Sequence, residues 1–170
     1  MMKTRKVVGL FTVLLASMLL VACGQKTTKD GVPTILQDKY SGYSNVLGTD
    51  GPFAEGGSEL AFDKKKNTIV NLSDENGKYI YYFQVVPEDK LTSKEKGILA
   101  KHKSELEGKD YFLMKVDSDK SSLPKIVDEK IGVTYGVVLN DGGKSIHIFE
   151  FEWQGYSSDK YYNFTGQATK

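Results

Sequence analysis

Two glutamates in an alternating segment are the first residues that could do chemistry. Glu150 and Glu152 are two positions apart, so in a β-strand both lie on one face. Paired carboxylates can act as acid and base on a glycosidic bond. The same spacing is common on the solvated face of a strand, and this second interpretation is favoured here. The pair alone therefore does not predict a glycosidase.

The two histidines, His102 and His147, do not predict a metal centre. Zinc sites combine three or four nitrogen, sulfur or carboxylate ligands, and neither histidine stands at a ligand spacing. His102 falls on the apolar side of a predicted helix, and His147 shares a strand face with aromatic residues. Both are interpreted as core or rim residues. We expect no cofactor and no metal, and we expect that the chain is not an enzyme.

Two further motifs have simpler interpretations. Gly142-Gly143-Lys144-Ser145 ends like a phosphate-binding P-loop, but Val138 stands where that loop needs a glycine, and a strand follows instead of a helix. The acidic segment that begins at Asp117 resembles the start of a calcium loop. It has Ser122 in place of the glycine at the sharp turn and Asp128 in place of the final glutamate. We interpret the first motif as a hairpin turn and the second as a solvated loop, with a weak, irregular calcium site as the alternative.

The one cysteine, Cys23, follows the most apolar stretch of the chain. Lys3, Arg5 and Lys6 precede this stretch, and small residues lead from it to the cysteine. This order of positive charge, apolar run and small residues is typical of a secretory signal peptide. The fifteen residues 7–21 would span about 22 Å as a helix. A bilayer core is about 30 Å thick, which argues against a permanent transmembrane helix.

Leu20-Val21-Ala22-Cys23 resembles the lipobox of bacterial lipoproteins. The resemblance implies that residues 1–22 are removed and that the Cys23 thiol receives a diacylglyceryl group. Two acyl chains give stable anchoring, so it also implies a lipid-anchored protein on the extracytoplasmic face of the cell membrane. The abundance of lysine resembles lipoproteins of Gram-positive bacteria. The alternative is a plain secretory signal peptide in which Cys23 stands by chance.

Composition limits the remaining possibilities. The chain has 170 residues, with 23 basic and 22 acidic side chains, and the predicted leader removes three of the basic ones. Nucleic-acid binding is not expected, because it normally requires a strong basic bias. Ten tyrosines and eight phenylalanines are ample for a packed core. We expect residues 23–38 to form the lipidated cysteine and a flexible tether, and residues 39–170 to form a single β-rich domain.

Alternation with a period of two predicts a mainly β fold, with at least seven antiparallel strands in a barrel or strongly curved sheet. The predicted strands are Ser58–Asp63, Thr68–Leu72, Lys78–Val86, Asp110–Asp117, Lys130–Leu139, Ser145–Trp153 and Tyr161–Gly166. Asn76-Gly77 predicts a hairpin turn because both residue types tolerate a positive φ.

One amphipathic helix is predicted near residues 92–107, inserted between strands. Thr92 and Glu95 have the spacing of a capping box, in which each side chain bonds the other residue's backbone N–H. Gly108 is a typical helix stop. Ile98 and Leu106 fall on one side, so the helix is expected to cover part of the sheet.

A lipobox, a tether and a hairpin-rich barrel together resemble the lipocalin-like lipoproteins of bacteria, over residues 40–166. The resemblance implies a barrel that could hold a ligand. The Gly-x-Trp signature of lipocalins is missing, since Ser41-Gly42-Tyr43 stands at the expected first strand.

Two non-catalytic functions are therefore compared. The first is a binding module for a small apolar or amphipathic ligand in the barrel, with small residues on one wall leaving room opposite aromatic ones. Its candidate pocket residues are Tyr79, Tyr81, Phe149 and Trp153. The alternative is a cell-envelope interaction protein that binds another protein or an envelope polymer and uses these rings as core. An open cavity favours the first function, and a filled barrel favours the second.

The glycine-rich segment Gly48–Gly57 is a candidate contact loop because it contains Phe53. The ring either faces a partner or plugs one end of the barrel. The plug is the favoured interpretation.

Overall fold

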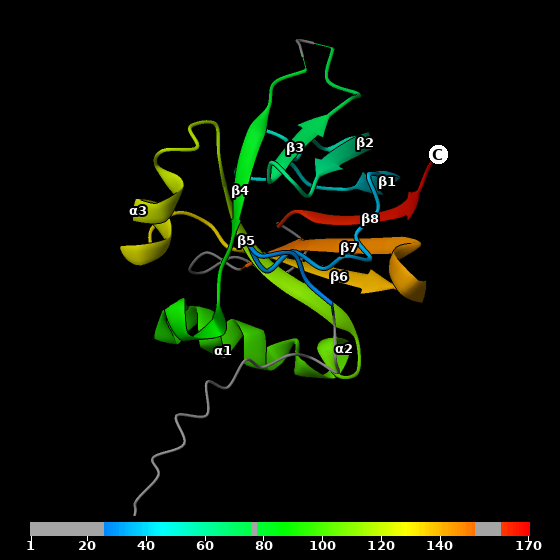
Figure 1. The fold of residues 1–170 in the computed structure, drawn as a ribbon. Coiled ribbons are helices and arrows are strands. Elements are labelled where there is room, and N and C mark those ends of the chain that lie inside the picture. The colour runs from blue at the N-terminus through cyan, green and yellow to red at the C-terminus, as the bar shows by residue number, and fades with distance from the viewer. Residues whose placement is uncertain (1–25, 76–77, 152–160) are drawn as a thin grey trace, which may run out of the picture.

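A computed structural model describes residues 26–75, 78–151 and 161–170. Eight antiparallel strands close into a barrel in sequence order, and β8 pairs with β1 (Figure 1). The strands are β1 (Lys39–Ser44), β2 (Gly56–Asp63), β3 (Thr68–Asn71), β4 (Tyr81–Val85), β5 (Asp110–Asp117), β6 (Tyr135–Asn140), β7 (Ser145–Glu150) and β8 (Asn163–Ala168). The predicted fold class is confirmed.

The helices lie outside the barrel (Figure 1). They are the short η2 (Glu88–Lys90), α1 (Ser93–Lys101), α2 (Lys103–Leu106), α3 (Leu123–Asp128) and η3 (Asp141–Gly143). The predicted helix is confirmed, with an interruption at His102 between α1 and α2. The sequence did not lead us to expect α3, which begins with Pro124 in its first turn. None of the helices in the described residues is long and apolar enough to cross a membrane.

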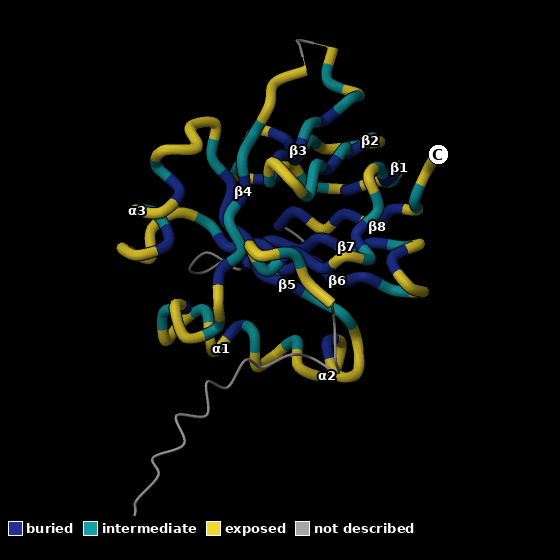
Figure 2. Tube along the Cα trace, in the orientation of Figure 1, coloured by how far each residue is buried: buried dark blue, intermediate teal, exposed yellow. Residues whose placement is uncertain are grey.

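Large buried side chains fill the barrel interior, and much of the backbone of the strands is coloured dark blue, as buried, in Figure 2. In register, alternate residues of neighbouring strands meet inside, as Phe62 opposite Ile69 and Val137 opposite Ile148 do. The fully or almost fully buried interior includes Tyr40, Leu60, Phe62, Phe83, Phe112, Met114, Tyr135, Ile148 and Phe164. An eight-stranded barrel is only wide enough for its own side chains or one small ligand, so these rings occupy most of it.

A second apolar cluster lies between α1–α2 and the outer face of the barrel. Ile98 and Leu106 of the helices pack with Leu113 of β5, Val138 of β6 and Phe149 of β7. The expected role of the helix as a cover is confirmed, but the surface it covers is the outside of β5, β6 and β7.

The stretch before β1 closes one end of the barrel. Thr27 pairs with Pro33, and Val32 and Leu36 are fully buried in the interior cluster. The Tyr40 hydroxyl donates to the carbonyl of Gly143 at 2.8 Å, which joins this end to the β6–β7 turn. The flexible tether expected for residues 23–38 is therefore wrong for this stretch. Burying its apolar side chains is lower in free energy than leaving them in water.

Several predicted strands are longer than those found. β4 begins at Tyr81 instead of Lys78, and β6 begins at Tyr135 instead of Lys130. The predicted Asn76-Gly77 turn lies outside the described residues. The part of the Ser145–Trp153 strand after Phe151 also lies outside them.

Candidate functional site

The predicted ligand pocket is not assembled inside the barrel. Tyr79 is 59% exposed and precedes β4, whereas Phe149 is buried on the outer face of the barrel under α1–α2. Tyr81 is half-buried at one barrel mouth, against Gly51. Trp153 and the lipidation candidate Cys23 lie outside the described residues.

The inference that small residues leave room opposite Phe149 is wrong. Gly136 of β6 pairs directly with Phe149 of β7, and the ring lies on the glycine. The other side of the ring stacks on His102, with 4.5 Å between centroids. The glycine therefore marks a position that a ring already covers.

Phe53 plugs this same mouth of the barrel, opposite the end that the stretch before β1 closes, as the favoured interpretation predicted. It comes from the segment between β1 and β2 and is 0% exposed. Its ring lies 4.4 Å from that of Tyr135 and 4.8 Å from that of Tyr162, centroid to centroid. The close approach requires Gly48, where a Cβ would lie 2.5 Å from the Cβ of Phe53.

Polar groups hold this plug in place. The backbone N–H and the hydroxyl of Thr49 both donate to the Glu150 carboxylate, at 3.2 and 2.5 Å. The N–H of Asp50 donates to the Tyr135 hydroxyl at 3.1 Å. Glu150, which the sequence favoured as a solvated residue, is instead buried in the barrel mouth. The aromatic residues of β7 lie on its outer face, so the Glu150 carboxylate lies on the inner face.

Two buried oxygens at this mouth have no hydrogen-bond partner within the described part of the chain, Asp50 Oδ2 and the Tyr162 hydroxyl. Burial raises the pKa of Asp50 to about 6, with a smaller contribution from the charge of Glu150, against a lowering effect of the Tyr135 hydroxyl. Burial also raises the pKa of Tyr162. Such unpartnered groups are uncommon in folded proteins.

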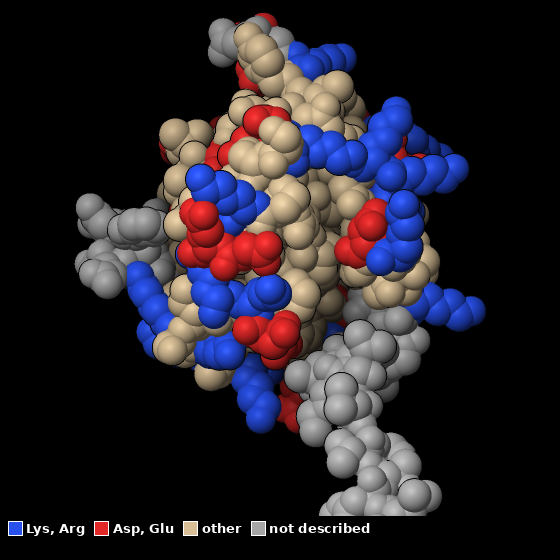
Figure 3. Space-filling model, turned by 60° about the vertical axis from the view of Figure 1, so that its left-hand side comes forward, with Lys and Arg blue, Asp and Glu red and all other residues tan. Residues whose placement is uncertain are grey.

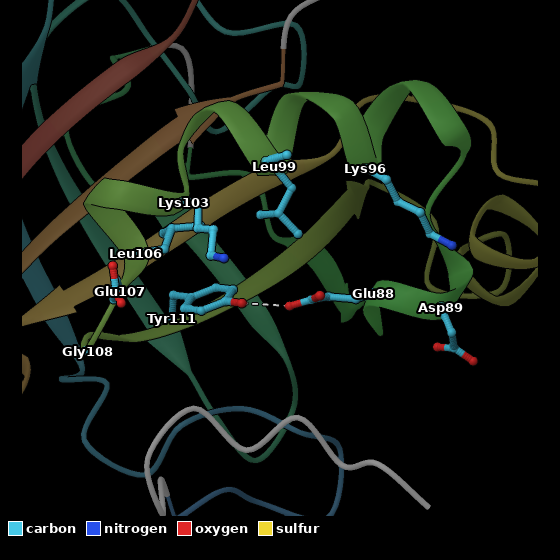
Figure 4. Close-up of a pocket in the computed structure, with 10 residues that line it drawn as sticks. Glu88, Asp89, Lys96, Leu99, Lys103, Leu106, Glu107, Gly108 and Tyr111 are labelled. Carbon is cyan, nitrogen blue, oxygen red and sulfur yellow. Dashed lines mark hydrogen bonds between the residues drawn. The ribbon is translucent and has the colours of Figure 1, made fainter.

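A second feature is a groove outside the barrel, between α1–α2 and the start of β5 (Figure 4). Its volume is about 620 Å³, within the range of small-molecule sites. Leu99, Leu106 and Tyr111 supply apolar surface, and Lys96 and Lys103 extend from the helices (Figure 4). Glu88 and Asp89 of η2 form the opposite side.

The charged groups that line the groove differ in whether they have partners among the described residues. The Tyr111 hydroxyl donates to Glu88 at 2.6 Å, and burial, followed by this contact, raises the pKa of Tyr111 to about 12. Lys96 and Lys103 form no ion pair with the described residues. Elsewhere on the surface shown in Figure 3, lysines and carboxylates are interspersed. The two free ammonium groups on the helix wall can therefore hold an anion beside an apolar surface.

The helix wall is fixed by a capping box and a buried ion pair. The Thr92 hydroxyl accepts from the N–H of Glu95 at 3.1 Å, and Glu95 accepts from the N–H of Thr92 at 2.7 Å. Glu95 also accepts from the Thr134 hydroxyl at 2.6 Å and lies 3.3 Å from the ammonium group of Lys115, which is 2% exposed. Burial opposes the ionisation of Glu95, but these contacts outweigh it and lower its pKa. The predicted cap is confirmed, and its glutamate also ties α1 to β5 and β6.

Sequence reasoning missed the groove. Lys96 and Lys103 belong to the polar positions of the predicted helix, which do not by themselves indicate a site, and Glu88 and Tyr111 give no periodic signal. A chain reversal after Pro87, which places η2 beneath the helix, would have indicated the groove. His147 bonds Asn163 at 2.7 Å, and no group of three potential metal ligands occurs among the described residues.

No family model, curated protein or solved structure matches this chain.

Proposed function

We propose that the chain is a membrane-anchored, extracytoplasmic lipoprotein that binds a small amphipathic ligand without chemical conversion. The anchor would be a diacylglyceryl group on Cys23. The binding site would be the groove between α1–α2 and β5, in place of the filled barrel interior. The barrel then serves as a rigid support.

The groove is the observation that carries this proposal. Its 620 Å³ matches a small ligand, and its apolar surface, formed by Leu99, Leu106 and Tyr111, can cover a hydrocarbon body. The ammonium groups of Lys96 and Lys103 can pair with an anionic head. A fatty-acid-like amphiphile combines these two properties.

Photocrosslinking tests this site. The full chain is incubated with a diazirine-bearing fatty acid, and labelled peptides are mapped by mass spectrometry. We expect labels on α1, α2 and the start of β5. Ala100→Trp should fill the groove and reduce labelling at least fivefold, whereas Ser104→Trp, on an exposed helix position outside the groove, should not.

Charge variants test the anionic head. Lys96→Glu combined with Lys103→Glu should weaken labelling, and Lys125→Glu on α3 supplies a distant control. Equal labelling of all these variants would reject the groove as the site.

The second candidate function is binding to a cell-envelope partner, which the filled barrel favours. Leu47, Tyr79, Ile80 and Ile131 are large apolar side chains that are about half exposed or more. All four lie in connections at the Phe53 end of the barrel, opposite the end that the stretch before β1 closes. An anchored domain would present this end away from the membrane. Tyr79→Ser combined with Ile80→Ser should then abolish in-cell crosslinks to a partner but leave fatty-acid labelling intact.

A further inference from the structure

The mouth of the barrel beneath Phe53 has properties of a covered binding site. Phe53 occupies a slot between the rings of Tyr135 and Tyr162, yet it belongs to a connection and not to a strand. No ladder hydrogen bond of the barrel depends on it. The ring can therefore leave the slot while the strands stay paired.

Few bonds retain the connection. Thr49 bonds Glu150, Asp50 bonds Tyr135, and the Pro52 carbonyl accepts from Asn71 at 3.2 Å. Within the connection, Gly48 and Phe53 bond through their backbones at 2.8 Å. These contacts involve side chains of the wall, which a ligand could satisfy in their place.

Neither Glu150 nor Asp50 forms an ion pair with the described part of the chain. Glu150 is buried in the mouth, Asp50 is next to it, and Asp117 of β5 is near enough to raise the pKa of Asp50 further. The lysine whose charge reaches Asp50 is Lys115, and its ammonium group already contacts Glu95 and the carbonyl of Gly132. Among residues 26–75, 78–151 and 161–170, the other titratable groups that face the mouth are the phenols of Tyr81, Tyr135 and Tyr162. Buried carboxylates without a cationic partner are costly.

We propose that this mouth is a second binding site, for a small organic cation with an aromatic or apolar body, and that Phe53 is its displaceable internal occupant. The body of the ligand takes the place of the Phe53 ring between the two tyrosines. The cationic group lies beside Glu150, where the tyrosine faces also attract it. The Tyr162 hydroxyl, which has no partner among the described residues, belongs to a ring that lines the same slot.

The pH dependence follows from the same groups. Burial raises the pKa of Asp50 to about 6, so this carboxyl ionises as the pH rises through that value. Ionisation disfavours the closed connection and favours a cation in the mouth. Binding should therefore strengthen between about pH 5 and pH 7.

Calorimetric titration of the purified full chain tests the proposal with two probes of similar shape and opposite charge, phenethylammonium and phenylacetate. Phe53→Ala opens the slot, and cavities of ring size are known to accept aromatic molecules. We expect this variant to bind phenethylammonium at least tenfold more tightly than phenylacetate. The wild type should show the same preference with weaker affinity, because its competent state is less populated.

Two controls separate a site from a simple cavity. Phe149→Ala removes an equally large ring outside the barrel, away from Asp50 and Glu150, and should show no preference for the cation. Glu150→Gln added to Phe53→Ala should reduce the preference to less than threefold. Equal binding of both probes by Phe53→Ala would overturn the proposal, as would an equal preference in Phe149→Ala.

Hydrogen exchange in the wild type decides the matter if Phe53→Ala does not fold. Phenethylammonium should speed exchange of the Thr49 amide, which bonds Glu150 of the wall only while the connection is closed, and of the Gly48 and Phe53 amides if their bonds within the connection also open. Phenylacetate should leave their exchange unchanged. Unchanged exchange with both probes would refute displacement of Phe53.

Discussion

The ring of Phe149 lies directly on Gly136 across the β6–β7 pair, so that a Cβ on the glycine would be 2.2 Å from Phe149 Cζ. Phe149 cannot easily move away, because His102 and Phe151 stack beside it at 4.5 and 5.8 Å between centroids. We expect Gly136→Ala to lower the free energy of unfolding by about 1–3 kcal/mol through overpacking. Denaturant unfolding measures this. Adding Phe149→Leu should recover part of the loss, and strict additivity of the two changes would contradict the contact.

The cap of α1 gives a second prediction. Thr92→Ala removes the hydroxyl that accepts from the Glu95 N–H at 3.1 Å, so the free energy of unfolding should fall by about 1 kcal/mol. Ser93→Ala, at the next and exposed position, should change it little. A denaturation midpoint for Thr92→Ala equal to that of the wild type would show that the cap does not stabilise the helix.

The buried ion pair of Glu95 and Lys115 predicts that one substitution destabilises the protein and that a second one partly restores its stability. Glu95→Gln keeps the capping geometry but leaves the Lys115 ammonium group, 2% exposed, without its carboxylate. We expect this variant to lose about 3–5 kcal/mol of unfolding free energy. Lys115→Met in the same background should restore part of it, as measured by a double-mutant cycle. No recovery would show that the charge of Lys115 is not the cause.

Asp50 predicts a pH dependence of stability. Its pKa is about 6 in the folded protein, above the ordinary 3.8, so protonation stabilises the fold. This contribution is complete below about pH 3.8 and is lost as the pH rises through about 6. Between pH 4 and pH 7 the wild type should lose about 1–3 kcal/mol relative to Asp50→Asn, the upper value being reduced by partial solvent exposure. Glu55→Gln, an exposed carboxyl in the same connection, should keep the wild-type pH profile.

The anchor is tested by changing Cys23 to alanine. Metabolic labelling with a palmitate analogue should mark the wild type and leave Cys23→Ala unlabelled, because the thiol is the expected acceptor. The variant should also leave the membrane fraction or be misprocessed. Label retained on Cys23→Ala would contradict the lipoprotein assignment.

Local signals in the sequence predicted local structure well. The capping box of Thr92 and Glu95 depends on residues three positions apart, and it is present as expected. Alternation and turn residues predicted at least seven strands, and the seven predicted ranges overlap β2 to β8 of the eight strands found. These features are set by neighbours in the chain, so a sequence contains most of what decides them.

The inner and outer faces of β7 could not be distinguished in this way. One face carries Ile146, Ile148 and Glu150, and the other carries His147, Phe149 and Phe151. Both faces are largely apolar, since the barrel interior buries one of them and α1–α2 cover the other. Which face points inward depends on the curvature of the closed barrel. The candidate pocket was therefore placed on the wrong side of Phe149, and Glu150 was expected in solvent.

The expected tether is an error of another kind. Its short apolar segment was interpreted as flexible because most of the residues near it are polar. Val32 and Leu36 are four positions apart with Pro33 between them, and polar residues precede and follow this short segment, so it shows no sustained strand or helix period. Its burial depends on an open barrel end that only the assembled fold provides.

The closed ladder from β1 to β8 has one further consequence. Each strand has a neighbour on both sides, so the barrel offers no free strand edge to which an extended peptide could add by backbone pairing. Recognition at the barrel wall must then use side chains. The same closure removes the edges through which β-proteins most often polymerise.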